Sequence, residues 1–316
     1  MRPCLPSRRR WVFAALVMPL MLLAGQSPAS AQSRTPLFVS YNPLGGVVQA
    51  LTAPDSAPPG ANDWSCKPSS VHPDPVVLVP GTFADMADNF NSISPLLYDY
   101  GYCVFALNYG GTPGSPIQSV GEISASAAQL AAFVSQVLAA TGAAKVDLVG
   151  HSQGGMMPRY YLKFLGGASK VSRFVALAPS NHGTTLDGLV TLVNDFDALG
   201  LVNSLVAPGC EACVEQEAGS AFLANLNAGG DTVPGVSYTV IETKYDEVVT
   251  PYRSAFLTGS NVTNITLQNQ CPLDLTDHIG IAFDPVALTD MLNALNPGHP
   301  IPVPCLLVLP AAQPRR

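Results

Sequence analysis

The sequence has few charged residues. Of its 316 residues, 12% are Asp, Glu, Lys or Arg and 47% are hydrophobic, and the net charge is −7. No long basic run follows Arg10, so we expect no nucleic-acid partner, because binding nucleic acid requires a concentrated positive surface. So small a charged fraction is more typical of a compact secreted protein than of a cytosolic enzyme. The apolar content is sufficient for one large domain with a closed core.

The N-terminus has the three parts of a secretory signal peptide. Arg8-Arg9-Arg10 precedes an apolar stretch, residues 11–25, which is followed by the small residues Ala29-Ser30-Ala31. Removal of residues 1–31 would leave 11 basic and 22 acidic side chains, a net charge of −11. The stretch is short for a membrane anchor, and the cleavage site argues against one. We expect a secreted protein without a transmembrane anchor; the arginines also resemble a twin-arginine signal, so the export route stays open.

The exported chain is expected to lack free cysteine. An even number of cysteines in an exported protein indicates disulfides, although six cysteines allow fifteen pairings. Sequence order and the expected fold favour three pairs. These are Cys66–Cys103, Cys210–Cys213 and Cys271–Cys305.

The spacing Cys210-Glu-Ala-Cys213 has two other readings, half of a zinc site or a redox motif. No second Cys-x-x-Cys and no nearby pair of histidines accompanies it in the sequence. A redox motif would stand at the start of a helix after a strand, and no such pattern surrounds this one. The sequence therefore predicts a disulfide here, and neither a metal nor a cofactor for the protein.

Apolar runs alternate with helix-like segments from residue 76 onward, and no internal repeat is visible. The predicted strands are residues 76–79, 103–107, 146–149, 171–177, 238–243 and 262–267, and the predicted helices are 124–140, 153–164 and 284–295. Strands that alternate with helices form right-handed βαβ units. We predict an α/β fold in which helices flank a mostly parallel sheet.

Three further segments complete the predicted organisation around a catalytic domain at residues 71–296. Residues 32–70 are rich in Pro, Ser and Gly and predict an irregular leader, and residues 297–316 predict a Pro-rich tail tied by Cys305. Residues 181–234 contain no strand run. They carry apolar residues at helical spacing: Leu186, Leu189, Leu192, Val193, Phe196 and Leu199. An insertion this long is often a functional cap, although an ordinary packed helical excursion would have the same spacing.

The sequence around Ser152 has the nucleophile-elbow pattern. Residues 146–155 read VDLVGHSQGG, so an apolar run ends at Gly150 and Ser152 lies between Gly150 and Gly154. In this pattern a strained turn between a strand and a helix presents the serine hydroxyl at its tip. The glycines are needed because a side chain would collide across the turn. The sequence therefore predicts an α/β-hydrolase fold with Ser152 as nucleophile.

A serine hydroxyl needs a general base, normally a histidine that a buried carboxylate orients. In this fold the chain order is serine, acid, histidine, which leaves His182, His278 and His299 as candidates for the base. His299 lies in the Pro-rich tail, and no candidate acid separates His182 from Ser152. His278 follows the last predicted strand, where the base belongs. We predict that His278 is the base.

The acid is expected just after the strand before the last. Residues 238–243 lead into Tyr245-Asp246-Glu247, and we predict that Asp246 orients the base, since Glu247 would point elsewhere. Asp277 is adjacent to the base and is expected to cap or orient its loop. The 32 residues from Asp246 to His278 leave room for one crossover and one strand.

Two N–H donors are expected to form an oxyanion hole. One belongs to Gln153, which follows the nucleophile, and the other to Thr82 in the turn after the first strand, Pro80-Gly81-Thr82-Phe83. The Thr82 hydroxyl could add a third donor. A simple Pro-Gly turn is the plainer reading of this segment, but its position relative to the elbow favours the functional one.

Four motifs together resemble those of a known family. The motifs are Val79-Pro80-Gly81-Thr82, Gly150-His151-Ser152-Gln153-Gly154, Tyr245-Asp246-Glu247-Val248-Val249 and Asp277-His278-Ile279-Gly280. They resemble the secreted actinobacterial triacylglycerol lipases and esterases and the yeast lipase B type, over about residues 60–305. The resemblance implies an α/β-hydrolase of lipase type and an acyl-enzyme mechanism. The insertion and the tail follow the yeast enzyme less well, so its acyl-pocket geometry is not carried over.

These observations favour a secreted, monomeric serine carboxylester hydrolase that acts on a lipid or ester substrate, in solution or at a lipid–water interface. An acyltransferase or a polyester hydrolase would use the same three residues with another acceptor or substrate. A lipid-binding protein without activity is disfavoured, because Ser152, Asp246 and His278 are all present.

Overall fold

The computed structural model describes residue 1, residues 34–198 and residues 209–311. The predicted signal peptide, residues 199–208 of the predicted cap and residues 312–316 of the tail lie outside the described residues, apart from residue 1. Contacts divide the chain into Met1–Ser33 and Arg34–Arg316. The sheet and the candidate site lie in the second unit, and the predicted boundaries of leader, catalytic domain and tail within it stay predictions.

A parallel sheet of six strands forms the centre of the described part. The strands are β1 (Val76–Val79), β2 (Val104–Ala106), β3 (Val146–His151), β4 (Val171–Leu177), β5 (Ser237–Glu242) and β6 (Val262–Thr266). Their order is β2-β1-β3-β4-β5-β6, and every neighbouring pair is parallel. All residues of β1 and β3 are buried, as the strands of a sheet covered on both faces must be. The predicted α/β fold is confirmed.

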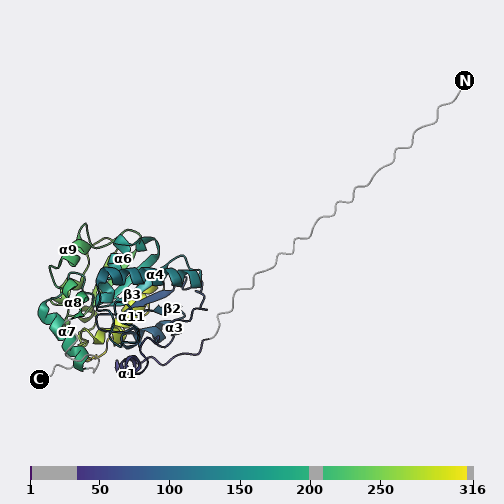
Figure 1. Ribbon diagram of the computed structural model, residues 1–316. Helices are drawn as coiled ribbons and strands as arrows, with labels where there is room; N and C mark the ends of the chain where they lie inside the picture. Colours follow the sequence, from purple (N-terminus) through teal and green to yellow (C-terminus); the bar gives the residue numbers. More distant parts are fainter. Residues whose placement is uncertain (2–33, 199–208, 312–316) are drawn as a thin grey trace. The chain divides into compact units, whose positions relative to one another are not determined.

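Helices cover both faces of this sheet. They are α1 (Leu44–Thr52), α2 (Met86–Phe90), α3 (Ile93–Asp99), α4 (Ile123–Thr141), α5 (Gln153–Met156), α6 (Pro158–Phe164), α7 (Leu186–Ala198), α8 (Glu211–Glu215), α9 (Ala221–Asn227), α10 (Leu267–Gln270) and α11 (Pro285–Leu295). Figure 1 shows α4 and α6 on one side of the strands and α3 and α11 on the other. Among the described helices, only α4 is long and apolar enough to cross a membrane. Its buried apolar residues recur at helical spacing and join the hydrophobic core.

The register of the sheet places the end of β3 at the centre of one edge. Val79 of β1 lies opposite Gly150 of β3, and His151 lies opposite Leu177 of β4. Since the strands are parallel, their carboxyl ends meet at this edge, where open α/β sheets bind ligands. Ser152 is the first residue after β3 and therefore lies between the ends of β1 and β4.

Two segments differ from the sequence prediction. The leader was predicted to be irregular, and this is wrong for residues 44–52, which form α1 and bury Val47 and Ala50. The reason is a close contact with α2: a side chain at Gly46 would lie 2.6 Å from the carbonyl oxygen of Ala87. The predicted helix 153–164 is divided into α5 and α6, because Pro158 has no N–H and begins a new helix.

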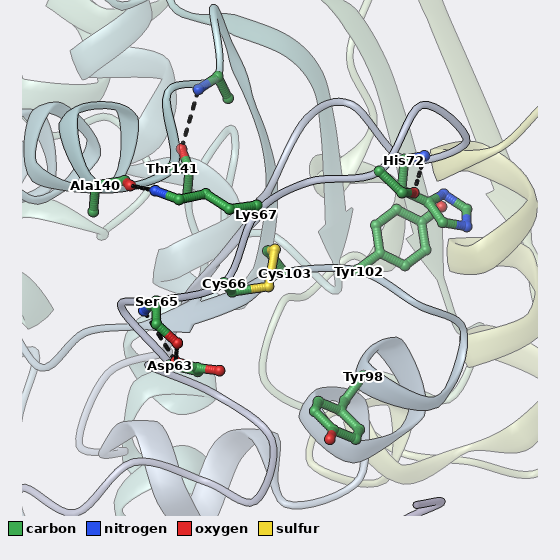
Figure 2. The surroundings of a disulfide bond; sticks show 12 residues. Asp63, Ser65, Cys66, Lys67, His72, Tyr98, Tyr102, Cys103, Ala140 and Thr141 are labelled. Atoms are coloured by element: carbon green, nitrogen blue, oxygen red, sulfur yellow. Dashed lines mark hydrogen bonds between the residues drawn. A yellow bond between two sulfur atoms is a disulfide. The ribbon is translucent and has the colours of Figure 1, made fainter. Parts of the chain in front are cut away.

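Three disulfides join the cysteines in the pairs that sequence order favoured, Cys66–Cys103, Cys210–Cys213 and Cys271–Cys305. The first ties the leader to the residue before β2 (Figure 2). Beside it, Lys67 donates a hydrogen bond to the carbonyl oxygen of Ala140 at the end of α4. The third ties the tail to the residue after α10.

Reduction is expected to lower the melting temperature of the folded protein. Cys66–Cys103 and Cys271–Cys305 span 37 and 34 residues, and the loop-entropy estimate gives each about 3–4 kcal/mol of stability. Cys210–Cys213 spans 3 residues and should contribute little to global stability. Thermal unfolding of the paired serine variants measures this: a melting temperature unchanged in the first and third pairs would contradict it, and the Cys210–Cys213 pair is the control.

Candidate active site

Ser152 occupies a strained turn that only small neighbours permit. Its φ of 56° and ψ of −122° lie outside the regions that non-glycine residues favour. A side chain at Gly150 would lie 1.8 Å from the carbonyl oxygen of Gly154, and one at Gly154 would lie 1.9 Å from that of Val79. Both glycines are therefore required by the chain crossing that joins β3 to α5. The elbow has the geometry that presents a nucleophile.

The structure brings Ser152, His278 and Asp246 into one hydrogen-bonded chain. His278 Nε2 is 3.0 Å from Ser152 Oγ, and His278 Nδ1 is 2.8 Å from Asp246 Oδ2. The second oxygen of Asp246 accepts hydrogen bonds from the N–H groups of Val248 and Val249, at 2.8 and 2.6 Å. The side chains of Ser152, His278 and Asp246 are all buried. This is the relation of nucleophile, base and orienting acid that serine hydrolases require.

The charges around His278 favour its protonated form. Burial lowers the pKa of His278, but Asp246, Glu247 and Asp277 together outweigh burial, so that the net shift is upward. Glu247 accepts a hydrogen bond from the backbone N–H of His278 at 3.3 Å. Burial raises the pKa of Glu247 to about 8, a shift that His278 opposes and Asp277 and Asp246 increase. Asp277 accepts from the N–H of Gly280 at 2.6 Å, which fits its expected role in the loop.

His151 and Asn89, for which the sequence predicts no role, link the loop that carries His278 to the turn after β1. His151 Nε2 donates to the carbonyl oxygen of His278 at 2.9 Å, and His151 Nδ1 lies 3.0 Å from Nδ2 of Asn89. Asn89 Oδ1 accepts from the N–H of Gly81 at 2.8 Å. Burial, together with nearby His278, lowers the pKa of His151 to about 3. A neutral His151 thus connects the loop that carries His278 to the turn after β1.

The turn after β1 passes directly beside the nucleophile. A side chain at Gly81 would lie 2.9 Å from Cβ of Ser152, so the following residue, Thr82, is within reach of the reacting centre. Gln153 begins α5, and the first N–H groups of a helix have no partner within it. The Thr82 hydroxyl donates to Oε1 of Gln153 at 2.7 Å and accepts from Nε2 of Gln216 at 2.9 Å. The third donor that the sequence suggested is therefore engaged with Gln153.

The insertion after β4 packs against the site. In α7, Leu189, Leu192 and Phe196 are buried, whereas Val190 is 53% exposed. The ring of Phe196 lies 5.9 Å from that of Phe83, edge to face. Leu199, the last member of the predicted apolar series, lies outside the described residues. The helical spacing is thus mainly a packing face that rests on the turn after β1.

The two remaining histidines after Ser152 lie apart from this chain of residues. Nε2 of His182 contacts Oδ1 of Asp231 at 3.2 Å, and its Nδ1 contacts the carbonyl oxygen of Ser254 at 2.9 Å. These contacts hold the insertion to the loop after β5. His299 lies beyond α11 and is exposed. Within residues 34–198 and 209–311, no cluster of three or more His, Cys, Asp or Glu could hold a metal ion.

Comparison with known families identifies the chain. Residues 73–288 match the profile of the lipase (class 2) family. The chain belongs to the class 2 lipases. This class 2 lipase is 34% identical over 138 residues to a triacylglycerol lipase of Pseudarthrobacter phenanthrenivorans, a match that covers 42% of this chain and 41% of the relative. It is 28% identical over 230 residues to lipase B of Pseudozyma antarctica, covering 70% and 61%. It thus spans about two to three fifths of the length of these curated relatives.

Solved structures show the same fold. Lipase B of Aspergillus fumigatus superposes with a TM-score of 0.56 at 22% identity, over 78% of this class 2 lipase and 57% of that chain. The mature form of the lipase BlEst2 of Bacillus licheniformis superposes with a TM-score of 0.50 at 18% identity, over 72% and 94%. At such identities the likeness concerns the α/β-hydrolase fold alone. Both the fold and the family that the four motifs suggested are confirmed.

Proposed function

We propose that this class 2 lipase is a secreted serine carboxylester hydrolase, a triacylglycerol lipase or esterase that works through an acyl-enzyme. The observation that carries the proposal is the chain of hydrogen bonds from Ser152 through His278 to Asp246. Family membership and relatives named triacylglycerol lipase support the substrate class. The predicted signal peptide and three disulfides support secretion, since disulfides persist in oxidising compartments.

The proposed reaction follows from the positions of these groups. Ser152 Oγ attacks the ester carbonyl carbon while His278 Nε2 takes the hydroxyl proton, and Asp246 holds the imidazolium in place. The N–H groups of Thr82 and Gln153 stabilise the oxyanion that develops on the carbonyl oxygen. His278 then returns the proton to the leaving alcohol, which leaves an acyl group on Ser152. A water molecule that His278 deprotonates releases the acid by the same steps.

Hydrolysis of p-nitrophenyl esters with acyl chains of increasing length tests the proposal, in parallel with an emulsified triglyceride. We expect product release by the wild type, and acylation of Ser152 by a phosphonate that traps serine nucleophiles. An added alcohol tests the acceptor: release of a new ester at the expense of free acid would identify an acyltransferase. An absence of turnover on every ester, with no labelling of Ser152, would contradict the proposal.

We expect the acidic limb of the pH profile of kcat/KM to have its inflection above pH 6.5. His278 must be neutral to accept the serine proton, and the balance of burial against its acidic neighbours raises the pKa of His278 above the 6.5 of an ordinary histidine. Consequently kcat/KM should fall as the pH decreases through that raised value. Initial rates on a soluble short-chain ester, measured from about pH 5 to 9, determine the limb; an inflection at or below 6.5 would contradict the expectation.

Helix α7 offers a matched pair of substitutions that separates lipid contact from packing. Val190 is 53% exposed and Leu189 is 6% exposed. Val190→Asp is expected to reduce activity on emulsified triglyceride about tenfold, as ~1.4 kcal/mol of lost apolar contact would, and to spare a soluble ester. Leu189→Asp should reduce both activities and lower the melting temperature. Equal losses on both substrates in Val190→Asp would mean that α7 does not contact lipid.

A further inference from the structure

Gln216, which follows α8 in the insertion, reaches the polar groups behind the proposed oxyanion site. Its Nε2 donates to the hydroxyl oxygen of Thr82 at 2.9 Å and to Oε1 of Gln153 at 3.3 Å. The side chain is buried, as are those of Thr82 and Gln153. A residue from the insertion therefore contacts the side chains of both residues whose N–H groups are proposed to stabilise the oxyanion.

Other contacts fix the orientation of the Gln216 amide. Oε1 of Gln216 accepts a hydrogen bond from the hydroxyl of Ser180 at 2.7 Å, and Nε2 donates to the carbonyl oxygen of Ala212 at 3.0 Å. A carbonyl oxygen can only accept, so Nε2 is the nitrogen and faces Thr82. The backbone of Gln216 is held as well, since its carbonyl oxygen accepts from the N–H of Thr184 at 3.0 Å.

The direction of these hydrogen bonds determines where the Thr82 hydroxyl proton can go. Because Gln216 donates to the hydroxyl oxygen, Thr82 must direct its own proton to an acceptor. In this structure that acceptor is Oε1 of Gln153, at 2.7 Å. If the hydroxyl turned toward a developing oxyanion, Oε1 of Gln153 would still be within 3.3 Å of the Gln216 donor. One N–H of the Gln216 amide points to Ala212, and the other lies between Thr82 and Gln153, which can share it. Gln153 Oε1 would then keep a partner, whereas an unpaired buried acceptor usually costs about 1–3 kcal/mol.

We propose that Gln216 is a positioning residue of the oxyanion site: it holds the Thr82 hydroxyl oxygen and keeps the Gln153 carbonyl paired while Thr82 donates to the oxyanion. The inference rests on the proposed function. In this arrangement the Thr82 hydroxyl donates to Oε1 of Gln153 in the ground state and to the oxyanion in the transition state. Gln216 itself touches neither the substrate nor the reacting atoms.

The principal test is a double-mutant cycle on Gln216 and Thr82. Gln216→Met is expected to lower kcat about 10- to 100-fold, in the range measured for loss of one oxyanion donor, with little change in KM. Thr82→Val removes the hydroxyl, retains the N–H and should cause a similar loss. Since Gln216 acts through that hydroxyl, adding Gln216→Met to Thr82→Val should cause almost no further loss in kcat.

Gln216→Glu is the second variant, because it has almost the same shape and the opposite direction of hydrogen bonding. Its carboxylate would accept the Thr82 proton and hold it away from the oxyanion, so kcat should fall at least as far as in Gln216→Met. Glu211→Gln, an exposed change on the same short helix, is the control and should retain the wild-type kcat. Thermal unfolding verifies that each variant is folded.

The outcomes separate this inference from the proposed function. An active wild type with an unchanged kcat in Gln216→Met would overturn the inference alone. Losses in kcat that multiply in the double variant would also overturn it, because Gln216 would then act on something other than the Thr82 hydroxyl. A wild type without ester hydrolysis would instead overturn the proposed function.

Discussion

Ser152→Ala is expected to abolish ester hydrolysis, with a loss in kcat of roughly 10⁴-fold or more, as for nucleophiles removed from comparable triads. The hydroxyl oxygen is the atom that would carry the acyl group, so no neighbouring group can replace it. The remaining turnover would come from substrate binding and the oxyanion donors alone. Steady-state rates on a soluble p-nitrophenyl ester measure the loss.

The same substitution should leave the protein folded. Ser152 is 3% exposed, and its described side-chain hydrogen bond is the one to His278, so removal of one oxygen changes packing little. Ser135→Ala, on the exposed face of α4, serves as the control for serine substitution in general. If a folded Ser152→Ala protein retained a tenth of the wild-type rate, Ser152 could not be the nucleophile.

Asp246→Asn is expected to lower kcat by roughly 10⁴-fold, the loss seen when the triad acid becomes an amide. Asp246 accepts from two backbone N–H groups through Oδ1 and from His278 Nδ1 through Oδ2. An amide turned with its oxygen toward Val248 and Val249 presents its NH2 group to His278. The imidazole is then held in the wrong tautomer and cannot accept the serine proton.

Asp277→Asn and Glu247→Gln are the matched controls for this prediction. Asp277 accepts from the N–H of Gly280, and Glu247 accepts from the backbone N–H of His278, so an amide oxygen can retain both contacts. Each variant should therefore lose far less kcat than Asp246→Asn. A larger loss in Asp277→Asn than in Asp246→Asn would transfer the role of the acid to Asp277.

The parts of the fold predicted correctly from the sequence are those that local pattern determines. Strands of a covered parallel sheet are continuous apolar runs, and the elbow requires glycine at 150 and 154 because the chains cross there within contact distance. The order of serine, acid and histidine then selected Asp246 and His278 among the few candidates that follow Ser152. In the structure these three side chains form one hydrogen-bonded chain, and their roles as nucleophile, acid and base stay predictions.

The parts that the sequence did not show depend on contacts between distant segments. Gln216 is 134 residues from Thr82 and 63 from Gln153, in a stretch whose apolar spacing predicted only a cap or a packed helical excursion. His151 lies inside the elbow motif, but its partner is a carbonyl oxygen 127 residues away. Close packing of α1 against α2 requires glycine at position 46. In the sequence alone, glycine in this segment favoured an irregular leader. A single sequence carries no local signal for such contacts.

The contacts of the tail have a consequence for when the site can be complete. Val308 pairs with Asp274 and accepts from the N–H of Leu275, and Cys305 binds Cys271, so the segment leading to His278 is braced by residues near the end of the chain. Cys305 and Val308 follow His278 in the chain and leave the ribosome after it, and a disulfide persists only in an oxidising compartment. A molecule in which this disulfide has not formed therefore lacks part of the brace on the loop of its base, and under the proposed secretion it should reach full activity only after export.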